Sequence, residues 1–429
     1  MQIIPLTKDN VLAETVKIRQ TRQAQNADIA PIVTKILSQV KQHGDEALKK
    51  YTLQFDNVAL DTFRVSEEEV QKALKQVDAN FLSLLKQAHA NISAYHALQL
   101  PKDFSYEKDG LSLSQRHSPV ERVGIYIPGG KTAYASTVLM NVIPAKLAGV
   151  QMLVLVTPPR QDGTVSSDIL AAAHVCGAAE HIYKAGGAQA IAALAYGTKS
   201  IPSVYKITGP GNLFVAEAKK QVYGQVDIDM IAGPSEILIL ADASAPVSYI
   251  AADILSQAEH DTDAVCILAC TSRDIAKKVL EEIDRQLGGS ENALRAQKAL
   301  AQNGKIFVCD EIDTLIALTN EIAPEHVEVM TDGAEAAADK INNAGNVFIG
   351  PYSPVAAGDY FAGPNHTIPT SGKAKFFSPL STADFMKHSN RIAYTKEGFF
   401  KDRDAIAAFA EQERFFFHAA AALRRKPND

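Results

Sequence analysis

Tryptophan is absent from the 429 residues, and there are only four cysteines. Cys266 and Cys270 are four residues apart, but the apolar residues between them predict a buried strand, on which these two positions lie too far apart to chelate one ion. Cys176 and Cys309 stand alone. We therefore expect core thiols, with no disulfide framework, no cysteine metal site and no catalytic cysteine.

Long apolar runs and basic stretches are also missing. The most apolar segment, residues 138–157, contains Pro144 and Lys146, which would be costly in lipid. Residues 1–10 lack the apolar core of a signal peptide. The formal net charge is −6, and one basic cluster, at residues 424–426, lies near the C-terminal end. We therefore expect a cytoplasmic protein that binds neither membranes nor nucleic acid.

Short apolar runs alternate with amphipathic stretches from residue 122 onward, which predicts parallel sheets with helices on both faces. The expected helices are 135–148, 212–221 and 246–258. The expected strands are 124–127, 152–156, 204–207, 237–240, 265–269, 306–308 and 346–349. Because so many strands would overfill one small sheet, the predicted fold class is α/β with two Rossmann-like parallel-sheet units, the second beginning near Ile237.

Both ends of the chain are predicted to be helical. Apolar residues recur at helical spacing over residues 29–48, and the sequence at 66–69 forms a capping box whose helix should run past Leu85. From Ser381 the pattern again favours helix, and it ends in an alanine-rich segment, 405–423.

No GxGxxG fingerprint follows a strand, and no HExxH motif occurs. Glycine-rich turns nevertheless close two predicted strands, at Gly129-Gly130 and at Gly209-Pro210-Gly211-Asn212. Each turn leads to a helix N-terminus, where backbone N–H groups can bind a phosphate. Such turns are also common in α/β proteins without a nucleotide, so the turns alone leave nucleotide binding open.

Four of the 11 histidines stand beside other potential ligands or bases. Gln257 and His260 share a helix face and could reach one ion, although exposed polar residues are the commoner explanation of such a pair. Glu325 and His326 offer two bases with different pKa values; the alternative is a polar loop tip.

The segment 358–366 is rich in glycine and proline, and it presents Asp359 and His366 from a tight loop, which favours a functional role. Glu413 and His418 lie five residues apart near the C-terminal end and do not share a helix face. A set of nitrogen and oxygen ligands that zinc accepts would consist of Gln257, His260, Asp359 and a fourth histidine. Their spacing in the sequence leaves this set open.

A series of segments in these regions resembles the histidinol dehydrogenase family. The matching segments, in family order, are 120–130, 186–192, 209–212, 232–236, 256–260, 324–326 and 358–366. Together they span most of the chain, and only the first hundred residues match loosely. A coincidental match to the whole series is very improbable, so the resemblance carries expectations about the site.

The resemblance implies one zinc ion per subunit, NAD as cofactor and an acid–base pair formed by Glu325 and His326. The implied zinc ligands are Gln257, His260, Asp359 and His418. The implied substrate contacts are these four residues with Ser235, His326, His366 and Glu413. The implied NAD contacts are Tyr126, Gln189 and Asn212.

The resemblance also implies the reaction and the assembly. L-histidinol would be oxidised through a bound aldehyde to L-histidine with two NAD, in the last steps of histidine biosynthesis. The family is a homodimer whose C-terminal segment enters the partner's active site. The implied division is an N-terminal segment, a zinc and substrate domain in two pieces, an NAD domain and a tail. Their bounds are 1–25, then 26–121 with 235–380, then 122–234, and finally 381–429.

Two departures from the family pattern stand out. Arg414 and three phenylalanines, residues 415–417, separate Glu413 from His418, where the family commonly has Gly and Leu next, and the spacing between the acid and the histidine is kept. The turn after Gly130 lacks the proline often found there. We expect effects on dimer packing or nucleotide affinity, because no catalytic group is removed.

Three alternatives remain open at this stage. A related dehydrogenase would oxidise another small amino or hydroxy alcohol. A zinc hydrolase would use the same ligands around a metal-bound water, and its activity would not require NAD. A non-catalytic scaffold would have no need for Glu325, His326, Asp359 and His366 in tight loops.

Overall fold

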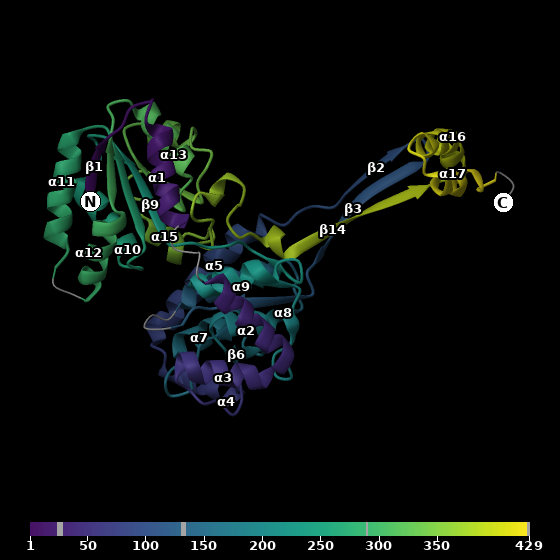
Figure 1. The fold of residues 1–429 in the computed structure, drawn as a ribbon, viewed down its shortest axis with the longest axis horizontal. Coiled ribbons are helices and arrows are strands. Elements are labelled where there is room, and N and C mark those ends of the chain that lie inside the picture. Colours follow the sequence, from purple (N-terminus) through teal and green to yellow (C-terminus); the bar gives the residue numbers. More distant parts are fainter. Residues whose placement is uncertain (24–28, 130–133, 289–290, 427–429) are drawn as a thin grey trace.

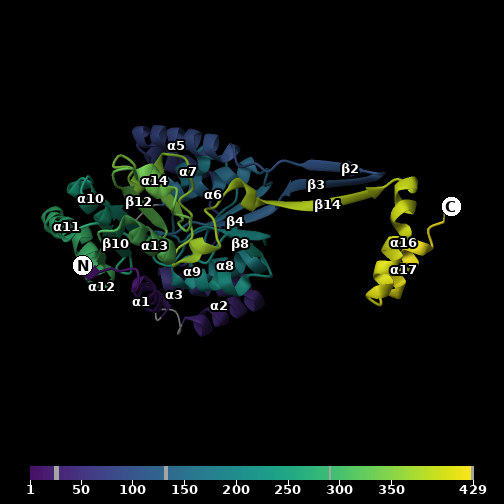
Figure 2. The ribbon, with the colours of Figure 1, turned by 90° about the horizontal axis from the view of Figure 1, so that it is seen from above.

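The computed structural model describes residues 1–23, 29–129, 134–288 and 291–426. The turn that the sequence analysis singled out after Gly129 falls at residues 130–133, outside the described residues. The described chain forms two α/β lobes, from whose junction an arm projects (Figures 1 and 2). Two parallel-sheet units were predicted, and this prediction is confirmed.

The six-stranded lobe is built on a parallel sheet in the order β1-β11-β10-β9-β12-β13. Its strands are β1 (Gln2–Pro5), β9 (Glu236–Ala241), β10 (Val265–Cys270), β11 (Lys305–Val308), β12 (His326–Met330) and β13 (Asn346–Ile349). One face packs against α10 (Val247–Ala258), α11 (Arg273–Gln286) and α12 (Glu291–Asn303). The other face packs against α1 (Val11–Gln23), α13 (Ile312–Ile322) and α14 (Ala334–Ala338). Residues 1–25 were predicted as a separate segment, but β1 is a strand of this sheet because it pairs with β11.

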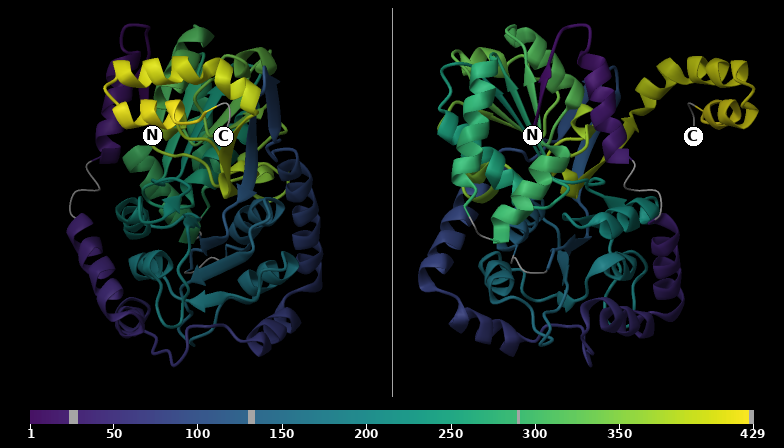
Figure 3. Two further views of the ribbon diagram at one scale, coloured as in Figure 1. Left: turned by 90° about the vertical axis from the view of Figure 1, so that its right-hand side faces the viewer. Right: turned by 60° about the vertical axis from the view of Figure 1, so that its left-hand side comes forward.

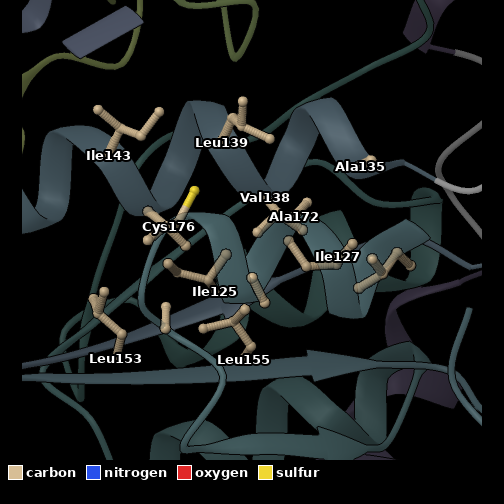
Figure 4. Close-up of a cluster of buried hydrophobic side chains, with 14 of the residues drawn as sticks. Ile125, Ile127, Ala135, Val138, Leu139, Ile143, Leu153, Leu155, Ala172 and Cys176 are labelled. Carbon is tan, nitrogen blue, oxygen red and sulfur yellow. The ribbon is translucent and has the colours of Figure 1, made fainter. Parts of the chain in front are cut away.

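The five-stranded lobe has a parallel sheet in the order β6-β5-β4-β7-β8. Its strands are β4 (Arg122–Tyr126), β5 (Met152–Thr157), β6 (Ile182–Lys184), β7 (Lys206–Thr208) and β8 (Asp227–Ile228). The crossover helices are α6 (Ala135–Leu147), α7 (Ser167–Val175), α8 (Gly187–Tyr196) and α9 (Leu213–Val222). Figure 4 shows one face of this core, where Val138 and Leu139 of α6 lie over Ile125 and Leu155.

Four N-terminal helices belong to this same lobe, which corrects the predicted domain division. They are α2 (Ala30–His43), α3 (Asp45–Asp56), α4 (Glu67–Gln76) and α5 (Ala79–Ala97), and they surround the five-stranded sheet (Figure 3). Val33 and Leu48 are buried in one of its cores, and Val70 and Ile92 in the other. Residues 26–121 had been grouped with residues 235–380, and that grouping is wrong for these helices because their apolar faces pack on the other lobe.

The predicted capping box at α4 is confirmed. The Ser66 hydroxyl accepts from the Glu69 N–H at 3.2 Å, and a Glu69 carboxylate oxygen accepts from the Ser66 N–H at 3.0 Å. The helix ends at Gln76 instead of running past Leu85, because Asp78 caps a new helix by accepting from the N–H groups of Asn80 and Phe81.

The arm consists of β2 (Phe104–Lys108), β3 (Leu111–Pro119) and β14 (Met386–Tyr394), an antiparallel sheet in the order β14-β3-β2. At its far end lie α16 (Lys396–Gln412) and α17 (Phe416–Leu423) (Figure 1). The prediction of a wholly helical tail is therefore wrong for β14. Among the described residues, no helix is both long and apolar enough to cross a membrane.

The four cysteines are free thiols, and Cys176, Cys266 and Cys270 are buried in the two lobes as predicted, while Cys309 is half-buried.

Candidate active site

The predicted acid–base pair lies at the amino-terminal edge of the six-stranded sheet. His326 is the first residue of β12, and Ser235 directly precedes β9, the neighbouring strand. Glu325 and His326 are both buried. Glu325 accepts a hydrogen bond from the backbone N–H of Glu236 at 2.7 Å, which fixes the carboxyl between the two strands.

One hydrogen bond of the His326 ring shows which nitrogen carries the proton when the imidazole is neutral. Its Nδ1 lies 2.9 Å from the carbonyl oxygen of Glu236, which can only accept, so Nδ1 carries the proton. Nε2 then holds a free lone pair, and this buried atom has no hydrogen-bond partner among the described residues. Asp359 Oδ1 lies 3.9 Å from Nε2. His326 is therefore a ready proton acceptor.

The surroundings move the pKa values of the pair in opposite directions. Burial lowers the pKa of His326 to about 4, and the nearby His260 and His366 add to this effect. Burial also raises the pKa of Glu325 well above its usual value, helped by the carboxyls of Glu236 and Asp359. Burial thus favours the neutral form of both groups, and His326 Nδ1 lies 3.6 Å from Glu325 Oε2. Such separated values are typical of acid–base sites.

Asp359 and His366 do meet at the site, but the predicted loop at 358–366 is wrong for Asp359, because residues 355–360 form a helix. Asp359 belongs to α15 (Val355–Tyr360), and its carbonyl oxygen lies 3.2 Å from His366 Nδ1. Burial raises the pKa of Asp359 to about 7 and lowers that of His366 to about 4. The adjacent Asn365 donates to the Met140 carbonyl oxygen of α6 at 2.6 Å, so this loop is held against the five-stranded lobe.

Gln257 and His260 stand at the end of α10, on the same part of the six-stranded lobe. Gln257 is buried, and its backbone carbonyl oxygen accepts a hydrogen bond from the backbone N–H of His260 at 3.2 Å. His260 is exposed, yet desolvation by the surrounding atoms lowers its pKa. Its charge in turn lowers the pKa values of His326 and His366, so the three imidazoles lie close together. His260, Asp359, His326 and His366 are thus neighbours, and Gln257 lies one helical turn before His260.

The predicted NAD residues gather at the carboxyl-terminal edge of the five-stranded sheet. The Tyr126 hydroxyl, at the end of β4, accepts from the N–H of Gly187, the first residue of α8, at 3.1 Å. Gln189 on α8 is 1% exposed, and its Oε1 has no partner among the described residues. Asn212 caps α9 by accepting from the Phe214 and Val215 N–H groups, each at 3.1 Å. Polar groups and two helix N-termini therefore line this edge.

Glu413 and His418 are not brought to the site within one chain. Both are exposed, Glu413 directly after α16 and His418 in α17, and these helices lie at the far end of the arm (Figure 1). Among the described residues, no three His, Cys, Asp or Glu side chains form a metal site by themselves.

Two buried groups were missed by the sequence analysis. Glu328 is one: it lies two residues after His326 on β12, and a charged residue inside a buried, alternating strand is the signal that could have identified it. The other is the ion pair of Lys219 and Asp229, with side chains only 2% and 1% exposed. Lys219 Nζ donates to the Gly209 carbonyl oxygen at 2.9 Å, and the Gly209 N–H donates to Asp229 at 2.8 Å.

This pair fixes the glycine-rich turn before α9. Gly209 has φ +110°, and a Cβ there would collide with the Tyr126 carbonyl oxygen, so glycine is required.

Comparison with known proteins places this two-lobed α/β chain, with its buried histidine and carboxyl pair, among the oxidoreductases. The family model for histidinol dehydrogenase matches residues 19–426, and the chain belongs to that family. The histidinol dehydrogenase of Oceanobacillus iheyensis is 48% identical over 97% of this chain and 99% of its own. That of Listeria monocytogenes is 48% identical over 98% of each chain. The crystal structure of histidinol dehydrogenase from Elizabethkingia anophelis has a TM-score of 0.93 and 39% identity, covering 98% of this chain and 97% of its own.

Proposed function

We propose that this chain oxidises L-histidinol through a bound aldehyde to L-histidine with two NAD, as part of histidine biosynthesis in the cytoplasm. The single observation that carries this proposal is the buried Nε2 of His326, which keeps a free lone pair beside Asp359. Family membership supports the substrate and the cofactor.

The donor set of the site fits a zinc ion. Gln257 supplies an amide oxygen, His260 a neutral imidazole and Asp359 a carboxyl whose pKa is raised to about 7 by burial. Among the described residues, no Lys or Arg forms an ion pair with Asp359. A dication bound to these three side chains, with His418 as the fourth, would stabilise the Asp359 carboxylate. When bound, zinc would supply orientation and charge stabilisation for the polar groups of the substrate.

His326 and Glu325 would handle the protons of the reaction. In the first oxidation the alcohol proton moves to His326 Nε2 while the carbon gives up a hydride, and NAD is the acceptor of that hydride. In the second oxidation water adds to the aldehyde carbon, and Glu325, once it has released its proton, accepts one from that water. His326, after passing the alcohol proton to solvent, then accepts the hydroxyl proton of the hydrate as the second hydride leaves to a second NAD.

Tyr126, Gln189 and Asn212 would hold the nucleotide at the edge of the five-stranded sheet. Two helix N-termini there, those of α8 and α9, offer N–H groups suited to a diphosphate. The loop that carries His366 is tied to α6 through Asn365, so the substrate and nucleotide sides are connected by direct contacts.

We further propose a homodimer in which the arm delivers Glu413 and His418 to the partner's site. The arm leads away from the lobes, and its terminal helices bury few side chains of their own: Phe417 is 92% exposed. A mixture of His326→Asn and His418→Ala chains tests this exchange. In a hybrid dimer with exchanged arms, one of the two sites would be intact, so activity returns; if each arm served its own chain, the mixture would stay inactive.

The first experiment is NADH formation from L-histidinol by the purified protein, before and after zinc removal. Two NADH per histidinol, abolished by a chelator and restored by zinc, would support the proposal. Turnover of other amino or hydroxy alcohols without turnover of histidinol would favour the related dehydrogenase. Hydrolysis that needs zinc and no NAD would favour the zinc hydrolase.

A further inference from the structure

A buried carboxyl group joins the three elements that carry the site residues of the six-stranded lobe. Glu328 is 1% exposed on β12, and its Oε1 accepts from the Val355 N–H, the first residue of α15, at 2.9 Å. Its second oxygen, Oε2, is also buried and receives no hydrogen bond from an N–H or O–H group among the described residues. The Asp253 carboxyl of α10 lies within hydrogen-bonding range of Glu328.

The alternation of β12 explains this position. Val327 and Val329 point into the core under α13, so His326 and Glu328 point to the opposite face, toward α10. They are about 7 Å apart along the strand, the distance of two strand residues. Glu328 thus lies two residues further along β12 than His326, between the helix that carries Gln257 and the helix that carries Asp359.

Two carboxyl groups in contact cannot both be ionised at low cost when they are buried. Burial raises the pKa of both groups, that of Glu328 to about 9, and Asp253 adds to the shift in Glu328. A proton between the two carboxyls gives Glu328 Oε2 the hydrogen bond that it otherwise lacks. It also leaves Oε1 free to accept from Val355.

We propose that Asp253 and Glu328 share one proton, and that this carboxyl pair is a positioning clamp that holds α10, β12 and α15 in the arrangement needed to bind zinc. The clamp touches neither the substrate nor the ion. It acts through the elements to which Gln257, His260, His326 and Asp359 belong. The inference rests on the proposed function, since it concerns the proposed zinc ligands.

The test is zinc affinity, measured by competition with a chromogenic chelator on the full-length protein. Glu328→Leu keeps the volume but removes both hydrogen bonds, so zinc affinity should fall 10–100-fold, the range for groups that support metal ligands. Glu328→Gln has the shape and hydrogen-bonding groups of a protonated glutamate. Its carbonyl can accept from Val355 and its amide can donate to Asp253, so affinity should stay within about threefold of wild type.

A matched control separates positioning from general loss of stability. Leu315 of α13 is fully buried on the opposite face of the same sheet, and Leu315→Ala opens a cavity there that should lower the melting temperature. Zinc affinity equal in Glu328→Leu and Leu315→Ala would overturn the clamp. Equal losses in Glu328→Gln and Glu328→Leu would overturn the shared proton. Failure of the wild-type chain to bind zinc would instead overturn the proposed function.

Discussion

In the five-stranded lobe, buried lysines are paired with acids, whereas in the six-stranded lobe buried acids face neutral imidazoles and one another. Lys219 with Asp229, Lys206 with Asp227 and Lys184 with Glu69 neutralise charge within the chain. By contrast, among the described residues no Lys or Arg forms an ion pair with Glu325, Glu328 or Asp359.

The buried charges of the five-stranded lobe are thus paired within the chain, whereas the carboxyls of Glu325, Glu328 and Asp359 in the six-stranded lobe have no cationic side chain beside them among the described residues. A buried carboxyl without a cation takes up a proton or binds a metal. In the six-stranded lobe both outcomes fit the proposed function, because the reaction transfers protons and zinc is proposed to bind Asp359. In the proposed function the five-stranded lobe holds the nucleotide, and its Lys219–Asp229 pair fixes the turn that would contact it.

The largest effect is expected from His326→Asn. The variant removes the proton acceptor and keeps a side chain of similar polarity, so turnover with L-histidinol should fall about 10²–10⁴-fold. Steady-state NADH formation measures this loss. Zinc content and melting temperature, measured on the same preparation, should stay close to wild type. Wild-type turnover in this variant would remove His326 from the role of base.

Breaking a charge pair in the five-stranded lobe should reduce stability. Lys219→Met leaves Asp229 buried and unpaired, which should lower the free energy of unfolding by about 3–5 kcal/mol. Lys206→Met is the matched control, because its partner Asp227 is half exposed and can return to water, so about 1 kcal/mol is expected. Urea denaturation compares the two, and equal losses would contradict the distinction between them.

The carboxyl pair of the six-stranded lobe should make stability depend on pH. Burial and Asp253 raise the pKa of Glu328 in the folded protein to about 9, from 4.5 for a solvent-exposed glutamate, so its contribution is fully present below pH 4.5 and is lost as pH rises through about 9. Relative to Glu328→Gln, wild-type protein should therefore lose melting temperature between pH 5 and pH 9. Asp253 and His326, which share this face, remain in both proteins. Parallel curves would show that the Glu328 proton is not retained on folding.

The smallest effect is expected at the nucleotide edge. Tyr126→Phe removes the acceptor of the Gly187 N–H and should weaken NAD binding about fivefold, which corresponds to about 1 kcal/mol for one hydrogen bond. Tyr183, buried on β6 in the same sheet, is not among the proposed NAD contacts, so Tyr183→Phe serves as the control. Calorimetric titration with NAD measures both, and unchanged affinity in Tyr126→Phe would separate this hydroxyl from the nucleotide.

The sequence predicted the central strands well because β10 is apolar throughout and β4, β5 and β9 have polar residues only at their ends. It missed β12, where His326 and Glu328 interrupt the run, and β14, whose side chains are mostly exposed. The sequence also could not predict which elements pack together. The apolar face of α2 shows that this helix packs against another part of the chain, but it does not show which lobe that is.

The proposed site residues come from the family resemblance, while their arrangement comes only from the structure. In parallel α/β sheets, ligands usually bind at the carboxyl ends of strands. Tyr126 follows this rule, but Ser235 and His326 lie at the amino ends of β9 and β12. A pattern of strands and helices alone would have directed attention to the wrong edge of the six-stranded sheet.

The position of β1 also sets an order of assembly during synthesis. Residues 2–5 of β1 pair with residues 305–308 of β11. The first strand to be synthesised therefore cannot pair until about 300 further residues have been made. The five-stranded sheet ends at Ile228, and long-range pairing is the slow part of folding. The five-stranded lobe should therefore fold while the chain is still growing, and pulse-labelling hydrogen exchange during refolding should find the β1 amides among the last to be protected.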